Sequence, residues 1–319
     1  LPSTPGEVNR LQQGLSAADT GAWDSLRGLA AATGDPLVRR ILTWRLVSDP
    51  NANASFDELS AAMRDMPDWP RQSDIRARAE AAISQSSLNA AERIAWFTAN
   101  PPQTGDGQAA FAYALLQGGR ASEGRELARR TWRERNLSER QRFVLETAFA
   151  SALTADDHAA RVALVLWLDR VSEARALLPK LSAADRTLAN ARIALKTNPR
   201  RGLQAAVDAV PQSRQADPGF RYDRTRYVRR SGRPEDAVAH AVRIDATTAP
   251  IAARDDIHEE KRLYVPRLLR AGQARQAYRM ISAHGLTSGA RFADAEFLAG
   301  WISLRYLNDV PQAQRHFAT

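Results

Sequence analysis

Cysteine is absent from the 319 residues of this sequence, and lysine is nearly absent. Without cysteine the chain can form neither disulfide bonds nor thiolate metal sites. Lysine occurs only at Lys180, Lys196 and Lys261, so arginine supplies nearly all of the positive charge. The formal net charge is +9 at pH 7. This excess either reflects arginines spread over solvated helix faces or creates a field that attracts an anionic polymer.

Long hydrophobic runs are also missing. No apolar stretch approaches the roughly 18–20 residues that cross a bilayer as a helix, so we expect no membrane span. The first five residues, Leu1–Pro5, contain no starting Met, no basic segment and no apolar segment. A secretory signal peptide requires the basic and apolar segments. We therefore expect no signal peptide in this sequence, as in a mature or trimmed product.

Nucleotide and metal motifs are missing as well. The sequence contains neither GxGxxG nor GxxxxGK[ST], the glycine-rich patterns that cradle phosphates. None of the five histidines has a partner at the spacing of metal ligands; they are His158, His240, His258, His284 and His316. Structural capping or a solvated helix face is the interpretation that fits them. We expect no cofactor and no metal.

Adjacent carboxylates raise the question of glycosidase chemistry. The pairs are Asp156-Asp157, Asp255-Asp256 and Glu259-Glu260. A two-carboxylate glycosidase holds its acids about 5–10 Å apart across a cleft, whereas adjacent residues on one helix point in different directions. Asp156-Asp157 fits better as a pair of first-turn acids, which interact favourably with the helix dipole. We predict no catalytic residue in this chain.

Apolar residues recur with helical periodicity along the chain, and no sustained alternation indicates strands. Five hairpin turns are predicted, and each is followed shortly by a small residue near the start of the next helix. These turns, with their small residues, are Gly119-Arg120 with Gly124, Asp169-Arg170 with Ala174, Gly232-Arg233 with Ala237, Gly272-Gln273 with Ala277, and Asn308-Asp309 with Ala313. Their irregular spacing argues against a strict tetratricopeptide array and favours a degenerate solenoid.

The fold that we predict is all-α: a superhelix, or solenoid, of irregular helical hairpins that curves into a horseshoe or incomplete ring. At roughly 40 residues per hairpin the chain should hold on the order of 16–20 helices. No Gly/Ser/Pro-rich linker long enough to separate domains occurs in the sequence. We therefore expect a single domain over residues 1–319.

Helix boundaries are predicted by capping signals in the first half. Asp35-Pro36 reads as an N-cap followed by proline at the first helical position. Capping-box spacing occurs twice, at Ser55 with Glu58 and at Asn89 with Glu92. Two prolines and two glycines make residues 100–107 an irregular loop, ahead of a helix over residues 108–117.

The segment 254–317 predicts four consecutive helices. The first is expected to bury Ile257, Tyr264 and Leu268 on one face. The third is expected to present one apolar face made of Ala293, Phe297, Gly300, Trp301 and Leu304. Glycine costs about 1 kcal/mol in a helix interior, so we expect Gly300 to allow close approach of a neighbouring helix.

One basic patch is a candidate binding surface. Residues 221–230 are helical in pattern, and Tyr222, Arg226, Arg229 and Arg230 share a face at i, i+4, i+7 and i+8. A solvated face with buried aliphatic stems explains this pattern. Alternatively, the arginines bind carboxylates, which suit bidentate guanidinium geometry.

Several segments carry a resemblance to a known family. The most specific is Ala295–Arg305, AEFLAGWISLR, and His258–Tyr264, HEEKRLY, precedes it. Weaker matches lie at residues 100–107, 156–161 and 182–186. Together these segments resemble the N-terminal α-superhelical domain of the soluble lytic murein transglycosylases, bacterial enzymes that cleave the glycan strand of peptidoglycan.

The resemblance implies a scaffold that positions an enzyme on peptidoglycan glycan strands in the periplasm. The parent reaction is non-hydrolytic cleavage of the MurNAc–GlcNAc β-1,4 bond, which yields 1,6-anhydroMurNAc. The family uses a catalytic Glu in a Glu-Ser motif within a lysozyme-like domain C-terminal to the superhelix. No Glu-Ser dipeptide occurs in this sequence. We therefore expect that domain to be absent from this chain, and the chain alone to be inactive.

Two other classes of function stay open. The first is a stand-alone α-solenoid that recruits cell-wall enzymes without touching glycan. The second is a helical-repeat nucleic-acid binder, which needs a regular code in each repeat. The irregular spacing supplies no such code, so we expect no nucleic acid as partner. The resemblance implies peptidoglycan glycan strands as a partner and leaves other cell-wall enzymes open as further partners.

Overall fold

The computed structural model describes residues 4–319. The expectation of no signal peptide was based on residues 1–5, and residues 1–3 lie outside the described part. Every regular element within residues 4–319 is an α-helix or a short 3-10 helix, so the predicted all-α class is confirmed. None of the helices in that range is long and apolar enough to cross a bilayer.

The chain divides into two compact units at Leu153 and Thr154. No proline- or glycine-rich linker marks this boundary, and the expectation of a single domain over residues 1–319 stays a prediction. The helices of the first unit are α1 (Pro5–Asp19), α2 (Trp23–Ala32), α3 (Pro36–Ser48), η1 (Pro50–Ala52), α4 (Phe56–Asp65), α5 (Gln72–Ala82), η2 (Ile83–Gln85), α6 (Ala90–Ala99), α7 (Gly105–Gln117), α8 (Ala121–Glu134) and α9 (Glu139–Ala148).

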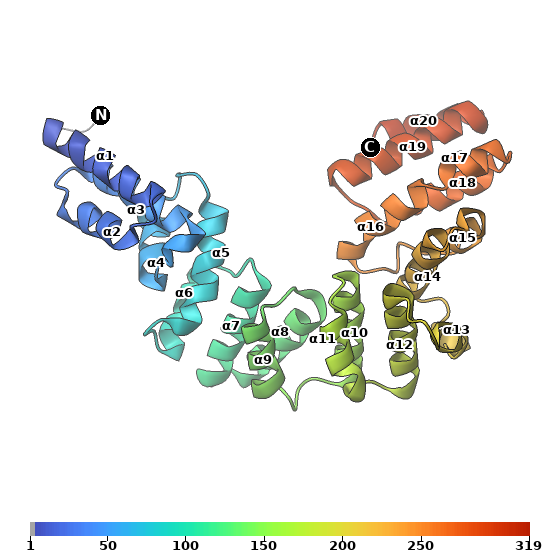
Figure 1. The fold of residues 1–319 in the computed structure, drawn as a ribbon, viewed down its shortest axis with the longest axis horizontal. Coiled ribbons are helices and arrows are strands. Elements are labelled where there is room, and N and C mark those ends of the chain that lie inside the picture. Colours follow the sequence, from blue (N-terminus) through green and yellow to red (C-terminus); the bar gives the residue numbers. More distant parts are fainter. Residues whose placement is uncertain (1–3) are drawn as a thin grey trace. The chain divides into compact units, whose positions relative to one another are not determined.

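The second unit begins with α10 (Figure 1). Its helices are α10 (Ala155–Trp167), α11 (Val171–Leu177), η3 (Leu178–Lys180), α12 (Ala183–Thr197), α13 (Leu203–Asp208), η4 (Gln212–Arg214), α14 (Pro218–Arg230), α15 (Pro234–Ala241), α16 (Ile251–Arg262), α17 (Val265–Arg270), α18 (Ala274–Ser282), α19 (Gly289–Tyr306) and α20 (Val310–Phe317).

Helix packing within each unit follows the order of the chain. Neighbours in sequence pack in pairs, such as α7 with α8 and α14 with α15. Alternate helices also touch: α1, α3, α5, α7 and α9 in the first unit, and α10, α12, α14, α16 and α18 in the second. Contact with only the nearest repeats defines a solenoid. The curvature into a horseshoe or incomplete ring stays a prediction.

All five predicted hairpin turns begin with a residue in the left-handed region. Their first residues, Gly119, Asp169, Gly232, Gly272 and Asn308, have φ between 52° and 81°. In four of the turns the next N–H reaches back to a carbonyl five residues earlier, as in the bond from Arg120 to Leu115 at 2.9 Å. This is the Schellman C-cap. The small residue that follows each turn is buried against the preceding helix, which explains why it is small.

The predicted helix starts are also confirmed. The side chain of Asp35 accepts from the amides of Leu37 and Val38. Both capping boxes form, at Ser55 with Glu58 and at Asn89 with Glu92. The helix expected over residues 108–117 begins earlier, at Gly105, because Thr104 is its N-cap.

Two predictions for the segment 254–317 are wrong. Where one helix was predicted first, the structure has two, α16 and α17. The break occurs because Pro266 lacks an N–H and helical backbone is disfavoured before proline. On α19 the buried face is Ala295, Ala299, Gly300, Ile302 and Ser303, whereas Phe297 and Leu304 are exposed. The residues on this face are small because α20 packs closely against it. An added Cβ at Gly300 would lie 2.6 Å from the Phe317 ring, which confirms the close approach expected of that glycine.

Candidate functional site

Three alternate helices of the second unit, α10, α12 and α14, end around one pocket. Asp169 follows α10, Lys196 and Asn198 lie at the end of α12, and Arg226 and Arg230 lie on the last turns of α14. The pocket, here called the α14 pocket, has a volume of about 440 Å³. Cations are favoured at helix C-termini because the macrodipole is negative there. The local fold therefore accounts for part of the positive charge at this site.

An ionic network forms the wall of the α14 pocket; Lys196 and Asp223 are nearly buried, whereas the side chain of Asp169 is 67% exposed. The ammonium group of Lys196 lies 2.8 Å from a carboxylate oxygen of Asp169 and 3.0 Å from one of Asp223. Asp223 also accepts a hydrogen bond of 2.8 Å from Nε of Arg192. Because the buried Asp223 has partners of opposite sign in Arg192 and Lys196, these ion pairs join α14 to α12.

Arg192 packs between an aromatic ring and a glycine. Its guanidinium carbon lies 5.3 Å from the ring centre of Trp167. A Cβ added at Gly219 would lie 2.4–2.6 Å from the guanidinium atoms, so only glycine leaves room for them. Nη2 of Arg192 is a buried donor without a partner among the described residues.

The four residues predicted from the sequence have different environments. Tyr222 is 5% exposed, and its ring lies 4.7 Å from that of Trp167, so it cannot stack on a ligand from solvent. Burial raises the pKa of the Tyr222 hydroxyl to about 12. The expected face is therefore not equally accessible at all four positions, because Trp167 from α10 covers Tyr222.

The charge of Arg229 is engaged by a buried carboxylate. Nε and Nη2 of Arg229 donate to the two oxygens of Glu260 at 2.8 and 2.7 Å. Hydrogen bonding to Glu260 raises the pKa of Arg229 above its ordinary value. Tyr264 donates to the same carboxylate at 2.6 Å. Arg229 therefore has a structural partner and is the member of the predicted set least available to a ligand.

Of the four predicted residues, Arg226 and Arg230 line the α14 pocket, as does Lys196. The two arginines are one helical turn apart, and neither forms a salt bridge within residues 4–319. Arg226 lies over the ring of Tyr222, with 5.4 Å between the guanidinium carbon and the ring centre. That contact orients the side chain and leaves its hydrogen-bond donors available. The structure thus brings two of the four predicted residues to one pocket.

The α14 pocket offers charged and polar groups to a ligand. Its wall carboxylates, Asp169 and Asp223, are both engaged by cations. No group of three potential ligands anywhere in the described chain is arranged to hold a metal ion. What the site offers is two guanidinium groups beside polar groups such as Asn198 and Ser231.

The contributions of Asp169, Lys196 and Asp223 were missed by the sequence analysis. The only signal for Asp169 was its place in a predicted turn. Lys196 and Asp223 stand in different helices, and nothing in the sequence indicates that they form a salt bridge.

Comparison with protein-family models, with curated proteins and with solved structures found no match to this chain. The resemblance to the lytic transglycosylases thus depends on the residues quoted for it, and what it implies about function is a proposal.

Proposed function

We propose that this chain is the helical scaffold portion of a periplasmic soluble lytic transglycosylase and that it helps to position the enzyme on peptidoglycan. The observation that carries the proposal is the pair Arg226 and Arg230, which line the α14 pocket without forming salt bridges in the described chain. Peptidoglycan presents carboxylates on its lactyl and peptide groups. Guanidinium groups bind carboxylates with charge-assisted hydrogen bonds.

The arrangement of the α14 pocket supports this proposal in a second way. The ion pairs of Asp223 with Arg192 and Lys196 join α14 to α12 beside the pocket. A ligand carboxylate would therefore meet arginines on a rigid support, so less conformational entropy would be lost on binding.

Co-sedimentation with purified peptidoglycan tests the proposal. The variant Arg226→Ala/Arg230→Ala should bind several-fold less than the unmodified chain. A matched control is Arg275→Ala/Arg279→Ala on α18, where two exposed arginines have the same spacing and the same charge is removed. Unchanged binding by the first variant, or equal losses in both, would contradict a role for the α14 pocket.

The catalytic part of the proposal has its own test. Since the chain has no Glu-Ser dipeptide, we expect it to release no 1,6-anhydro muropeptides from purified sacculi. Mass spectrometry of the soluble fraction would detect them, with an active lytic transglycosylase as the positive control. Release by the chain alone would show that the absence of catalysis was wrongly inferred.

A second candidate is an α-solenoid that recruits cell-wall enzymes. It is favoured by an apolar groove of about 760 Å³ in the second unit, lined by Leu263, Leu298, Trp301 and Tyr306 among others. Leu263 is 53% exposed, which is unusual for a leucine beside other apolar groups. Calorimetry with a purified lysozyme-like domain of a soluble lytic transglycosylase tests this candidate. The function would be favoured if the chain binds that domain, if Leu263→Asp abolishes the binding, and if the chain has no affinity for peptidoglycan.

A further inference from the structure

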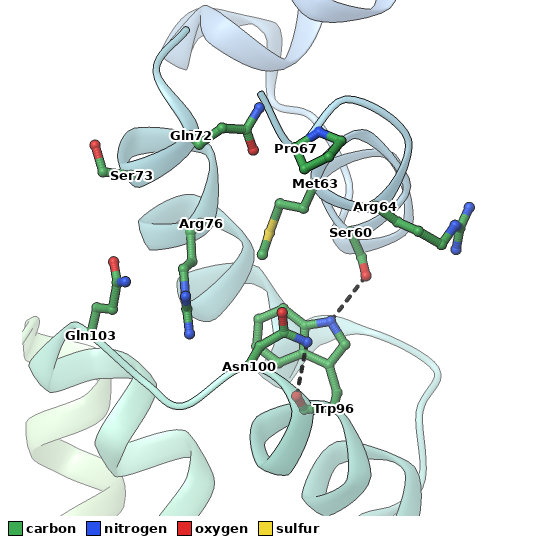
Figure 2. A pocket seen from close by; sticks show the side chains of 10 residues that line it. All are labelled: Ser60, Met63, Arg64, Pro67, Gln72, Ser73, Arg76, Trp96, Asn100 and Gln103. Atoms are coloured by element: carbon green, nitrogen blue, oxygen red, sulfur yellow. Dashed lines mark hydrogen bonds between the residues drawn. The ribbon is translucent and has the colours of Figure 1, made fainter. Parts of the chain in front are cut away.

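A second pocket lies in the first unit, where the ends of α4 and α6 meet α5 (Figure 2). We call it the Trp96 pocket, and its volume is about 580 Å³. Small-molecule sites typically enclose about 300–1,000 Å³. The ligand inferred for this pocket follows from its lining residues, and the choice of probe rests on the proposed function.

The indole of Trp96 forms an apolar wall of this pocket. Its N–H donates to Oγ of Ser60 at 3.0 Å, as the dashed line in Figure 2 shows. The ring also meets Phe56 and Phe97 edge-on, with centres 5.3 and 5.1 Å away. Because its one donor is already bound, Trp96 presents carbon surface to a ligand, and Met63 extends that surface.

Amide side chains supply acceptors in the pocket, and Figure 2 shows Asn100 beside Trp96. The amide nitrogen of Gln72 donates to the carbonyl of Met66 at 2.8 Å, and that of Asn100 donates to the carbonyl of Trp96 at 3.0 Å. These bonds fix both amides with their oxygens uncommitted. The side chain of Gln103 has no hydrogen bond within the described residues and lines the same pocket.

Arg76 provides positive charge beside these amides. Its Nη2 donates to the carbonyl of Pro101, and its Nε lies 3.5 Å from a carboxylate oxygen of Glu80. Nη1 of Arg76 has no such partner in the described chain. Figure 2 shows the side chain extending along α5 toward Asn100 and Trp96.

The loop beside the pocket is held in place by Glu80, which is fully buried. Its carboxylate accepts from the backbone amides of Gln103 and Thr104, both at 2.8 Å, and from the Thr104 hydroxyl at 2.6 Å. Gly107 makes room for it, since an added Cβ there would lie 2.3 Å from Oε2 of Glu80. No carboxylate lines the pocket itself. The site is therefore preformed. Glu80 behind the pocket balances part of the charge of Arg76, while no acidic group lies among the lining residues.

We infer that the Trp96 pocket binds a sugar ring that carries a carboxylate. An aromatic wall beside several amide acceptors fits a ligand that has one C–H face and many hydroxyl donors. A purely anionic ligand would leave the oxygens of Gln72 and Asn100 unpaired, which is costly in a pocket. The guanidinium group of Arg76 would bind the carboxylate.

Isothermal titration calorimetry with a matched pair of ligands tests this inference. N-acetylmuramic acid and N-acetylglucosamine share the same ring, but only the first carries a carboxylate. We expect the acid to bind several-fold more tightly than the neutral sugar. No binding of either at millimolar concentration, tighter binding of the neutral sugar, or tighter binding of an acidic peptide or a nucleotide would overturn the inference.

Variants locate the binding. Gln103→Ala should weaken binding of the acid about fivefold, the usual effect of losing one hydrogen bond. Trp96→Phe should weaken it by a similar factor because ring area is lost. The matched control is Trp44→Phe, since the indole of Trp44 also donates one hydrogen bond, to the carbonyl of Pro70 at 2.9 Å, but does not line the pocket. Full affinity in Gln103→Ala and Trp96→Phe, or an equal loss in Trp44→Phe, would overturn the assignment.

Discussion

At the scale of single residues, the carboxylate of Glu260 is a centre of polar contacts in the second unit. It is 4% exposed, accepts two hydrogen bonds from Arg229 on α14, and accepts a third from Tyr264. A buried charge with these partners is stable only while they are present. Arg229 is therefore a structural residue that joins α14 to α16.

Replacing Arg229 should reveal this role. Removing one partner of a buried pair costs about 3–5 kcal/mol, and because Arg229 is partly exposed we expect Arg229→Ala to lower the free energy of unfolding by about 2–3 kcal/mol. Arg230→Ala, which removes no salt bridge, should change it by less than about 0.5 kcal/mol. Urea denaturation followed by circular dichroism compares them. Equal stability of the two variants would refute the role assigned to Arg229.

A second carboxylate, the partly buried Glu296, joins α19 to two histidines. It lies 2.8 Å from Nε2 of His284 and 2.6 Å from Nδ1 of His316. The backbone amide of Leu286 donates to Nδ1 of His284, so Nε2 of that ring carries the proton donated to Glu296. Burial by itself would raise the pKa of Glu296, but the hydrogen bonds from His316 and His284 lower it below its ordinary value.

This lowered pKa predicts acid sensitivity. A carboxyl group whose pKa is lower in the folded state stabilises the fold above its unfolded pKa, about 4.3. That stabilisation is lost as the pH falls through the folded pKa. Glu296→Gln should therefore be about 1–2 kcal/mol less stable than the unmodified chain at pH 7, and the difference should shrink below about pH 4. Thermal unfolding across this range measures it, with Glu139→Gln as control because Glu139 is exposed. A difference that does not depend on pH would contradict the prediction.

The residue scale also shows where sequence reasoning reaches its limit. Helical period correctly places Arg226 and Arg230 on neighbouring turns, because that depends on α14 alone. Helical period could not distinguish Arg229 from Arg226. Arg229 is paired with Glu260 of α16, whereas Arg226 lies over the ring of Tyr222. The Trp96 pocket was not predicted at all, because its residues come from several helices and a loop.

At the scale of helices, the hairpin turns are what the sequence determines best. A Schellman turn needs a residue with positive φ and satisfies its hydrogen bonds within about six residues. Gly119 and Gly232 therefore reveal such turns locally. The buried face of α19 is less predictable, since the choice between the Phe297 side and the Ala299 side depends on α18 and α20.

Two glycines within helices have opposite expected effects when replaced by alanine. An added Cβ at Gly124 would lie 2.8 Å from the backbone oxygen of Ala112, so α8 would have to move away from α7. The Cβ at Gly300 would instead meet the ring of Phe317, a side chain that is 49% exposed and can rotate away. Alanine gains up to about 1 kcal/mol of helix propensity at either position.

The balance of these effects gives the prediction. Overpacking costs about 1–3 kcal/mol, so Gly124→Ala should be destabilising by about 1–2 kcal/mol after the gain in propensity. Gly300→Ala should be neutral or stabilising. Chemical denaturation of both variants, compared with the unmodified chain, decides this. A loss of stability at Gly300 equal to that at Gly124 would show that Phe317 cannot rotate.

At the scale of the whole molecule, core residues gather in local clusters along the chain. One cluster includes Leu26 and Leu42, another Leu59 and Ile75, and a later one Leu268. Each involves helices close in sequence, which is why helical period and turn signals were enough to predict a solenoid. The boundary between Leu153 and Thr154 could not be predicted, because it depends on which helices share contacts.

The net charge of +9 makes two origins of peptidoglycan binding possible, and ionic strength separates them. If the whole positive field attracts the polymer, removal of any two exposed arginines should weaken binding equally, and the effect should fade with salt. If the α14 pocket binds carboxylates directly, Arg226→Ala/Arg230→Ala should bind more weakly than Arg275→Ala/Arg279→Ala.

The expected result is a difference that persists at physiological salt. The Debye length is about 8 Å at 0.15 M and about 3 Å at 1 M. At 0.15 M salt and above, the attraction between distant charges is therefore largely screened. Direct hydrogen-bonded contacts between guanidinium and carboxylate groups are screened less. Co-sedimentation between about 0.05 M and 0.5 M salt should show both double variants weakened at low salt and only Arg226→Ala/Arg230→Ala clearly weakened at 0.15 M. Identical curves for the two variants would mean that net charge, and not the α14 pocket, accounts for the binding.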